Sequence, residues 1–351
     1  MKRFVENDAE IDTFWRSIIL LGNNVASYKF ALAKTLLELD TSDPFISLED
    51  LALPYAKNIA SHLANCKKQI TNPNGSKFLT LCESYSNELV DDDELRAVTA
   101  KTAFGDVIPR FHNVAGQTSI DFYEDLSKSK KGIMLTDNFY QLLQSSQHEN
   151  FLHEAESRWR LWEEAILSNL SQHFIIQYDK VTDELYHQRI DKLRRESITS
   201  AKPALNGYQE GQCFYCKQEI LLDAKKGDYG ACQVDHFFAW DFYKKTFYGD
   251  IETSLGKEVD RIWNLVLACE KCNMQKSSKL PNKDQNSKFP NYLKKLHDKN
   301  NALIRSPLPL KESIMQDTGL TETDRVSFLD KTYNELFSIK PYPWEPELIQ
   351  E

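Results

Sequence analysis

Apolar residues recur at helical spacing through most of the first 200 positions of the chain. In the segment 26–40 (ASYKFALAKTLLELD), Phe30, Ala33 and Leu37 follow one another at intervals of three and four. These intervals place the three side chains on one face of a helix. The longer segment 150–180 has the same periodicity. The pattern therefore predicts that this part of the chain is mainly α-helical.

The apolar stripe of the segment 150–180 contains several aromatic residues. Its members are Phe151, Ala155, Trp159 and Trp162. Such a stripe can form a packing face against other helices, or it can be a platform on which nucleic-acid bases stack. Because amphipathic helices bury such stripes as a rule, we interpret this one as a packing face.

The pattern changes after Pro203. Residues 227–240 (GDYGACQVDHFFAW) begin with glycines and continue as a β-branched and aromatic run, which predicts a strand. Residues 262–268 (IWNLVLA) indicate a second strand, and the run CNMQKSSK that begins at Cys272 predicts the start of a helix. Two further helical stretches follow Pro307.

These changes divide the chain into three expected parts. A mainly helical N-terminal region covers residues 1–205, a small domain of strands and helix covers 206–306, and a helical C-terminal extension covers 307–351. The expected fold class is therefore α+β.

Charge is distributed unevenly along the chain. The 351 residues carry a formal net charge of −9, whereas proteins that bind nucleic acid indiscriminately are usually basic. Residues 201–306 nevertheless hold 17 basic and 13 acidic side chains, so the remainder of the chain carries −13. The apolar fraction of 41% is high enough for a packed core and argues against wholesale disorder.

The start of the chain predicts its compartment. MKRFVENDAEIDTF has no apolar segment of the kind that secretory signals contain. Apolar runs such as Ile18 to Leu21 are far too short to cross a bilayer. We therefore expect a cytoplasmic protein with no membrane partner, in which the seven cysteines are not a disulfide framework.

Four of the cysteines form two CxxC pairs, one at Cys213 and Cys216 and the other at Cys269 and Cys272. A CxxC turn lets two thiolates converge on one ion, and two such turns complete a four-coordinate structural site. Zinc is the expected occupant. A redox pair or buried apolar cysteines are the alternatives, and the presence of two pairs favours the metal. Cys66, Cys82 and Cys232 lack a partner at ligand spacing, and we interpret them as small core residues.

Polar residues suited to phosphodiester hydrolysis lie between and after the thiol pairs: Asp235, His236, Asn264, Asn273 and Lys276. Carboxylate and amide oxygens suit Mg²⁺ or Mn²⁺, and a histidine held off the metal can take a proton from water. Lys276 follows Asn273 by three residues, so a helix would place both on one face. Each residue taken alone is more often a core histidine, a turn or a helix cap. Their combination between the cysteine pairs predicts a catalytic site.

At these residues the sequence resembles the HNH nucleases, which have the ββα-metal or His-Me finger fold. The resemblance covers about residues 213–281, and the whole chain looks more loosely like bacterial stand-alone HNH proteins. It implies that His236 is the general base, oriented by a backbone carbonyl, and that Asp235 and Asn273 bind one catalytic Mg²⁺ or Mn²⁺. It also implies that Asn264 braces the histidine loop. Ala239 stands where the family commonly has proline.

The resemblance also implies partners and a role. The substrate would be DNA, with RNA not excluded, and the context a bacterial defence or restriction system against foreign DNA. Lys276 would lie near the scissile phosphate. A larger basic set is expected to contact phosphates along the substrate: Lys279, Lys283, Lys288, Lys294, Lys295, Lys299 and Arg305.

Two further hypotheses concern the remaining parts of the chain. The acidic N-terminal region lacks a phosphate-binding GxxxxGK[ST] loop, and we expect it to bind a partner protein such as an ATPase or to restrain the nuclease. A homo-oligomer would allow both strands of a duplex to be cut. Two interpretations compete with the nuclease. One is a zinc-stabilised module that binds nucleic acid or protein through a degenerate nuclease site, and the other is a structural or adaptor protein that acts through its helical half.

Overall fold

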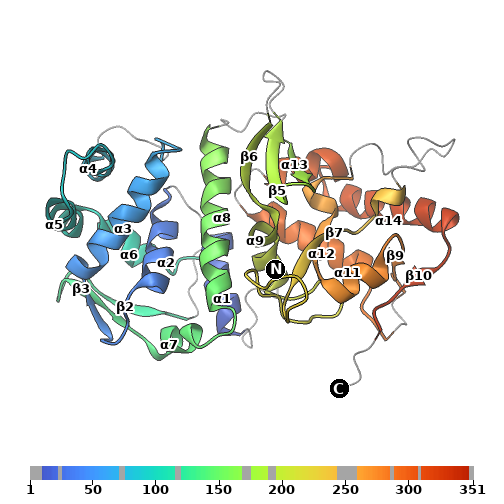
Figure 1. The fold of residues 1–351 in the computed structure, drawn as a ribbon, viewed down its shortest axis with the longest axis horizontal. Helices are drawn as coiled ribbons and strands as arrows, with labels where there is room; N and C mark the ends of the chain where they lie inside the picture. Colours follow the sequence, from blue (N-terminus) through green and yellow to red (C-terminus); the bar gives the residue numbers. More distant parts are fainter. Residues whose placement is uncertain are drawn as a thin grey trace. The chain divides into compact units, whose positions relative to one another are not determined.

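The computed structural model describes residues 10–22, 26–70, 76–114, 120–167, 175–188, 195–242, 259–284, 288–306 and 310–347. The chain forms two compact units, Met1–Asn169 and Leu170–Glu351. The predicted boundary near residue 205 falls inside the second unit, within a short helix, Ala201–Asn206. Figure 1 shows the elements of both units.

The first unit is built mainly from helices, as the periodicity predicts (Figure 1). These are α1 (Ile11–Leu21), α2 (Tyr28–Glu38), α3 (Leu48–Leu63), α4 (Lys77–Ser86), α5 (Asp92–Thr102), α6 (Phe104–Arg110), α7 (Asp137–Leu143) and α8 (His148–Leu167).

A small antiparallel sheet accompanies the helices of this unit, with strand order β1-β3-β2. Its strands are β1 (Phe45–Ser47), β2 (Tyr123–Leu126) and β3 (Gly132–Leu135). The chain passes from β1 directly into α3, where Ser47 and Asp50 form a reciprocal capping box. The box satisfies N–H groups that the first turn of α3 leaves without helical partners.

The aromatic stripe of α8 is a packing face, as the amphipathic pattern predicts. Trp159 is completely buried, and Trp162 is nearly so. The Phe30 ring of α2 lies 6.3 Å from the Trp159 ring and 6.5 Å from the Trp162 ring, measured between centroids. The imidazole of His62 stacks on Trp159 at 3.4 Å. The side chains that would serve as a base-stacking platform are therefore enclosed in the core.

A buried ion pair links α1 to α8. The Arg16 Nε donates to Glu154 Oε2 at 2.9 Å, and its Nη2 donates to Gln147 Oε1 at 2.8 Å. The exposed fractions of the Arg16 and Glu154 side chains are only 1% and 3%. Because a buried charge without a partner is costly, each group depends on the other for its place in the core.

The second unit begins with an antiparallel sheet of β4 (Ile176–Asp179), β5 (Glu184–Gln188) and β6 (Arg195–Ser200), in that order. The elements that follow are α9 (Ala201–Asn206), η2 (Gly207–Gln209), β7 (Cys232–His236), η3 (Ile262–Asn264), β8 (Leu265–Cys269), α11 (Glu270–Lys276), β9 (Leu280–Pro281), α12 (Tyr292–Arg305), α13 (Leu310–Thr318), α14 (Glu322–Ile339) and β10 (Pro343–Trp344). The two strands and the helix predicted within 227–279 correspond to β7, β8 and α11. The two helices predicted after Pro307 correspond to α13 and α14.

The fold class is α+β, but the sequence overestimates the helical share of the first 200 residues. The predicted helix over 150–180 ends at Leu167 in the structure, and residues 176–179 form β4 instead. Residues 168–174 lie outside the described part. Alternation explains the difference, because Ile176 and Tyr178 are buried between less buried neighbours, which is the period of a strand. None of the described helices has the length and apolar character needed to cross a bilayer.

The Arg16–Glu154 pair provides a test of the packing between α1 and α8. Glu154→Leu should lower the free energy of unfolding by about 3–5 kcal/mol, because among the described residues it leaves the buried Arg16 guanidinium without a negatively charged partner. The double variant Arg16→Met/Glu154→Leu should be more stable than Glu154→Leu alone. Urea denaturation of the full chain measures both. A double variant less stable than the single one would contradict this account.

Candidate active site and metal centre

Two strands and a helix form the framework of the candidate site. β7 and β8 pair antiparallel, with Cys232 opposite Cys269 and His236 opposite Leu265. α11 begins directly after β8 and packs against both strands. The order strand, strand, helix brings the ends of β7, the start of β8 and one face of α11 into the same neighbourhood. The intervening residues 243–258 lie outside the described part of the chain.

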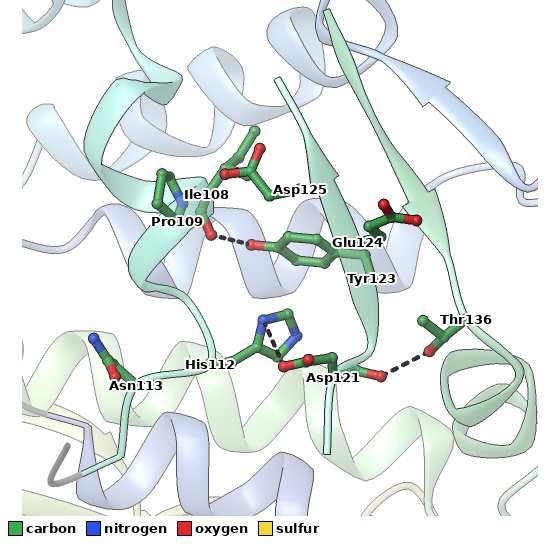
Figure 2. Close-up of a pocket in the computed structure, with 9 residues that line it drawn as sticks. All are labelled: Ile108, Pro109, His112, Asn113, Asp121, Tyr123, Glu124, Asp125 and Thr136. Atoms are coloured by element: carbon green, nitrogen blue, oxygen red, sulfur yellow. Dashed lines mark hydrogen bonds and ion pairs between the residues drawn. The ribbon is translucent and has the colours of Figure 1, made fainter. Parts of the chain in front are cut away.

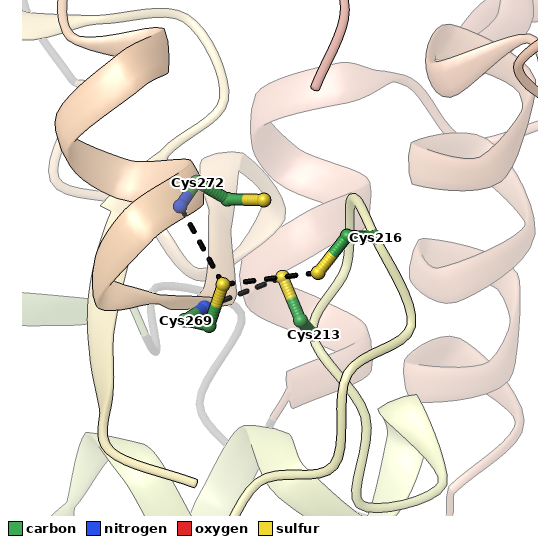
Figure 3. A group of neighbouring side chains, drawn as sticks. All are labelled: Cys213, Cys216, Cys269 and Cys272. Atoms are coloured by element: carbon green, nitrogen blue, oxygen red, sulfur yellow. Dashed lines mark hydrogen bonds between the residues drawn. The ribbon is translucent and has the colours of Figure 1, made fainter. Parts of the chain in front are cut away.

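The two CxxC pairs converge at the junction of β8 and α11 (Figure 3). Cys213 and Cys216 come from a loop, and Cys269 and Cys272 come from the end of β8 and the first turn of α11. All four sulfur atoms lie within 4.8 Å of one another, and the sulfurs of Cys216 and Cys269 are 3.7 Å apart. A tetrahedral zinc site with bonds of about 2.3 Å places its sulfurs about 3.8 Å apart. The cluster can therefore hold a metal ion such as zinc.

The environment of the cluster favours a thiolate at Cys213. Backbone N–H groups point at three of the sulfurs: that of Gln218 at Cys216, that of Cys269 at Cys213 and that of Cys272 at Cys269. Hydrogen bonds among the four sulfurs hold the pKa of Cys213 well below its usual range and raise the pKa of Cys269 and of Cys272. The thiolate is the form that binds a metal. Cys66, Cys82 and Cys232 are buried, in agreement with their interpretation as core residues.

The Asp235 carboxylate is held on both of its oxygens. The Tyr215 hydroxyl donates to Oδ2 at 2.6 Å, and the Lys276 ammonium donates to Oδ1 at 3.1 Å. Tyr215 lies between the two cysteines of the first pair, so the loop that carries two of the four clustered sulfurs also orients Asp235. A rearrangement of the cysteine cluster would consequently move the partner of this carboxylate.

Lys276 is completely buried on α11, where it faces β7. Its ammonium also donates to the backbone carbonyl of His236 at 2.7 Å. Burial lowers the pKa of Lys276, and the neighbouring Asp235 carboxylate opposes that effect. The resemblance places Lys276 beside a phosphate, which requires an accessible ammonium. In the structure this group instead joins the carboxylate of Asp235 to the end of β7.

Asn264 braces the segment that follows His236. Its Oδ1 accepts from the backbone N–H of Phe238 at 2.9 Å, and its Nδ2 donates to the carbonyls of Phe238 and Val259, both at 3.0 Å. The Asn264 carbonyl accepts from the Phe237 N–H at 2.8 Å. The side chain is completely buried, so these bonds satisfy groups that water cannot reach.

The partner of His236 is a carboxylate that the sequence analysis did not identify. His236 Nε2 lies 2.7 Å from Asp260 Oδ1, and Trp240 Nε1 donates to the same oxygen at 2.9 Å. The resemblance implies a backbone carbonyl in this place. Asp260 belongs to no motif and stands 24 positions from His236. Its proximity results from the folding of the chain, and no spacing in the sequence indicates it.

Asn273 and Lys276 share the face of α11 that looks toward β7, as their spacing predicts. The Asn273 amide nitrogen donates to the side chain of Gln233, and Lys276 contacts Asp235. Gln233 and Asp235 are two residues apart on β7, so they project from the same face of the strand. The His236 ring, in contrast, pairs with Asp260, and no hydrogen bond or ion pair among the described residues joins it to the Asp235 carboxylate.

The predicted phosphate-contacting lysines mostly have partners within the protein. Lys283 donates to Asn334, Lys294 donates to Asp298, and Lys295 donates to the carbonyl of Phe214. Lys279 is exposed and donates to the carbonyl of Gln275. Lys299 is an exception to the prediction, because it is buried and donates to two backbone carbonyls. It therefore cannot contact a phosphate on the surface.

Comparison of the chain with protein-family models, with curated proteins and with solved structures finds no match. The resemblance to HNH nucleases is therefore carried by the motif residues alone, without support from a family match.

A separate hollow of about 400 Å³ lies in the first unit (Figure 2). It is lined by Ile108, Pro109, His112, Asn113, Asp121, Tyr123, Glu124, Asp125 and Thr136. The His112 Nε2 accepts from the backbone N–H of Phe122 at 2.9 Å, and its Nδ1 lies 3.8 Å from Asp121 Oδ1. Burial lowers the pKa of His112 to about 4, although Asp121 opposes the shift.

The cysteine cluster provides a prediction for the second unit. The purified chain should hold about one zinc ion, and Cys213→Ser should release it, because three thiolates bind the ion more weakly than four. Loss of zinc should accelerate amide exchange in β7 and β8 at least about a hundredfold, since metal binding supplies folding free energy. Metal analysis and hydrogen–deuterium exchange measure the two effects.

The matched control for this experiment is Cys232→Ala, which removes a buried thiol from the same hairpin. This variant should keep its zinc. Full zinc occupancy and unchanged exchange in Cys213→Ser would show that the cluster is not a metal centre.

His112 provides a prediction of pH dependence. Its pKa is about 4 in the folded protein, against an ordinary value of 6.5, so between these values the unfolded chain binds a proton that the folded chain excludes. The free energy of unfolding should therefore fall as the pH decreases from 6.5 to 4, by about 3 kcal/mol from this group. His112→Gln should flatten that dependence in urea denaturation at several pH values. Parallel curves for the two proteins would contradict the prediction.

Proposed function

We propose that the second unit is a metal-dependent endonuclease of the HNH type that hydrolyses phosphodiester bonds of DNA. The observation that carries the proposal is the placement of His236. It ends β7, its ring pairs with Asp260, and the segment after it is braced by the buried amide of Asn264. An imidazole at the end of a strand, oriented by a carboxylate and set on a fixed loop, is suited to take a proton from water.

The cysteine cluster serves this site as a structural support. Four thiolates fill a tetrahedral zinc site and leave no position for a substrate, so the ion would contribute folding free energy and no catalysis. Cys213, Cys216, Cys269 and Cys272 would hold it.

The donors for a second, catalytic cation are the Asp235 carboxylate and the Asn273 amide oxygen. Hard oxygen donors suit Mg²⁺ or Mn²⁺. A carboxylate has about four acceptor positions, of which Tyr215 and Lys276 take two. The Asp235 carboxylate therefore keeps acceptor positions for a cation in addition to its contact with Lys276. When bound there, the cation would stabilise negative charge that develops on the phosphate and on the leaving oxygen.

The other steps of the reaction would be assigned to individual residues of the chain. His236 accepts a proton from the water that attacks phosphorus. Asn264 keeps the histidine loop in place, and Lys276 joins Asp235 to the carbonyl of His236. Lys276 therefore acts in our proposal as a positioning residue. Exposed lysines such as Lys279 and Lys294 would contact phosphates of the substrate, which orients DNA without reading its sequence.

A specific observation favours a second candidate function. The Asp235 carboxylate is buried and already accepts hydrogen bonds on both oxygens. If that arrangement persists with substrate, the unit would be a zinc-stabilised module that binds nucleic acid or protein without cleaving it.

Cleavage of a supercoiled plasmid in the presence of Mg²⁺ or Mn²⁺ separates the two candidates. His236→Ala should reduce the rate at least about a hundredfold, the usual contribution of a general base. The matched control His297→Ala changes a histidine of α12, outside the proposed site, and should cleave at the wild-type rate.

DNA binding measured by gel shift completes this experiment. His236→Ala should bind DNA as the wild type does, because the imidazole acts on the water rather than on the duplex. Equal cleavage rates for wild type and His236→Ala, or no cleavage by either, would exclude the nuclease and leave the binding module.

A further inference from the structure

The hydrogen bonds around Asp260 determine which nitrogen of His236 carries the proton. Trp240 Nε1 is a donor only, and it donates to Asp260 Oδ1. His236 Nε2 lies 2.7 Å from the same oxygen. A carboxylate oxygen is an acceptor, so the neutral imidazole can make this contact only when Nε2 bears the hydrogen. Nδ1 then has the free lone pair.

Backbone hydrogen bonds between the segment of Asp260 and β4 hold Asp260 in position. The carbonyl of Asp260 accepts from the N–H of Tyr178 at 2.9 Å, and Gln177 forms a bridge with Arg261. β4 therefore holds the segment that carries Asp260. The ring of Tyr178 also lies beside His236, with 5.9 Å between the centroids. The Asp260 carboxylate is thus held next to the imidazole by the sheet of β4, β5 and β6, which is separate from the β7–β8 pair.

The opposite edge of the imidazole carries Nδ1, in a residue that is 7% exposed. Within the described residues, Nδ1 of His236 has no hydrogen-bond partner, and it is not among the enclosed polar atoms without one. The edge that carries the lone pair can therefore receive a water molecule, whereas the Nε2 edge is occupied by Asp260.

We propose that Asp260 holds His236 in the Nε2–H tautomer and so makes Nδ1 the atom that removes the proton from the attacking water. This inference rests on the proposed nuclease function for its second half, the proton transfer. The first half, the tautomer of His236, does not depend on whether the chain cleaves DNA. Asp260 is a positioning residue, because it acts through His236.

A water gives one proton to Nδ1, which produces an imidazolium that Asp260 stabilises through Nε2–H. The resulting hydroxide forms a bond to phosphorus while the bond from phosphorus to the leaving oxygen breaks with its electron pair. The leaving oxygen takes a proton from solvent, and the imidazolium returns its proton to solvent.

The test uses the full zinc-loaded chain without Mg²⁺ or Mn²⁺. Two-dimensional ¹H–¹⁵N spectra of histidine labelled in the ring distinguish the two tautomers, and His236→Gln identifies the signals of His236. The wild type should show neutral His236 with its proton on Nε2. In Asp260→Asn the amide can accept from Trp240 and donate to Nε2, so the proton should move to Nδ1. The matched control Asp228→Asn changes an exposed carboxylate of the same unit and should leave the tautomer unchanged.

Cleavage kinetics test the second half of the inference. Asp260→Asn should lower kcat by at least about tenfold and at most by the factor expected for His236→Ala. It should change KM little. Zinc content verifies that the variant is folded. Asp260→Glu, which keeps the carboxylate, should retain the wild-type tautomer and recover part of the rate.

The outcomes separate this inference from the proposed function. The same tautomer in wild type and Asp260→Asn would overturn the role of Asp260. A changed tautomer with unchanged kcat would overturn the assignment of Nδ1. If the wild type cleaves no DNA, the proposed function and the proton-transfer step both fail, while the spectra still decide whether Asp260 sets the tautomer.

Discussion

The four-cysteine cluster is the constraint on which the geometry of the second unit depends. It joins two segments that are far apart in sequence: the 213–216 loop and the 269–272 turn, where β8 ends and α11 begins. Cys269 is also the residue that caps α11, because its sulfur accepts from the N–H of Cys272. The helix that carries Asn273 and Lys276 therefore starts at a member of the cysteine cluster. Its position relative to β7 follows from the position of the sulfurs.

Buried polar side chains extend this constraint to the candidate site. Tyr215 connects the cysteine loop to Asp235, and Lys276 connects Asp235 to the end of β7. From α12, Lys299 donates to the carbonyls of Ile262 and Leu265, on either side of the segment that presents Asn264. Each of these groups would be costly to bury alone, so each specifies where its partner must lie.

The first unit uses buried polar groups for a different purpose. There the Arg16–Glu154 pair and the stacked His62 lie among aromatic rings and connect helices to one another. These groups arrange the helices around α8, and their enclosure keeps them from acting on a substrate. Burial alone therefore does not mark a site; a reactive group must also keep an atom without a protein partner, as His236 Nδ1 does among the described residues.

The sequence by itself determined the local features of this protein. Period and turn residues located α2, β7, β8 and α11, and the two CxxC spacings identified four cysteines that the structure brings within metal-binding distance. These signals depend on neighbours within a few residues. The sequence pattern wrongly predicted a helix at β4. Its alternating run is only four residues long and follows a long helical pattern, which was extended through it.

Only the tertiary structure decided how the polar residues are paired. It buried Lys276 against Asp235 and Lys299 against backbone carbonyls, although both are ordinary members of a basic run in the sequence. It also brought Asp260 to His236 across 24 positions. Such contacts depend on how strands and helices pack, and packing joins residues whose separation along the chain follows no fixed spacing.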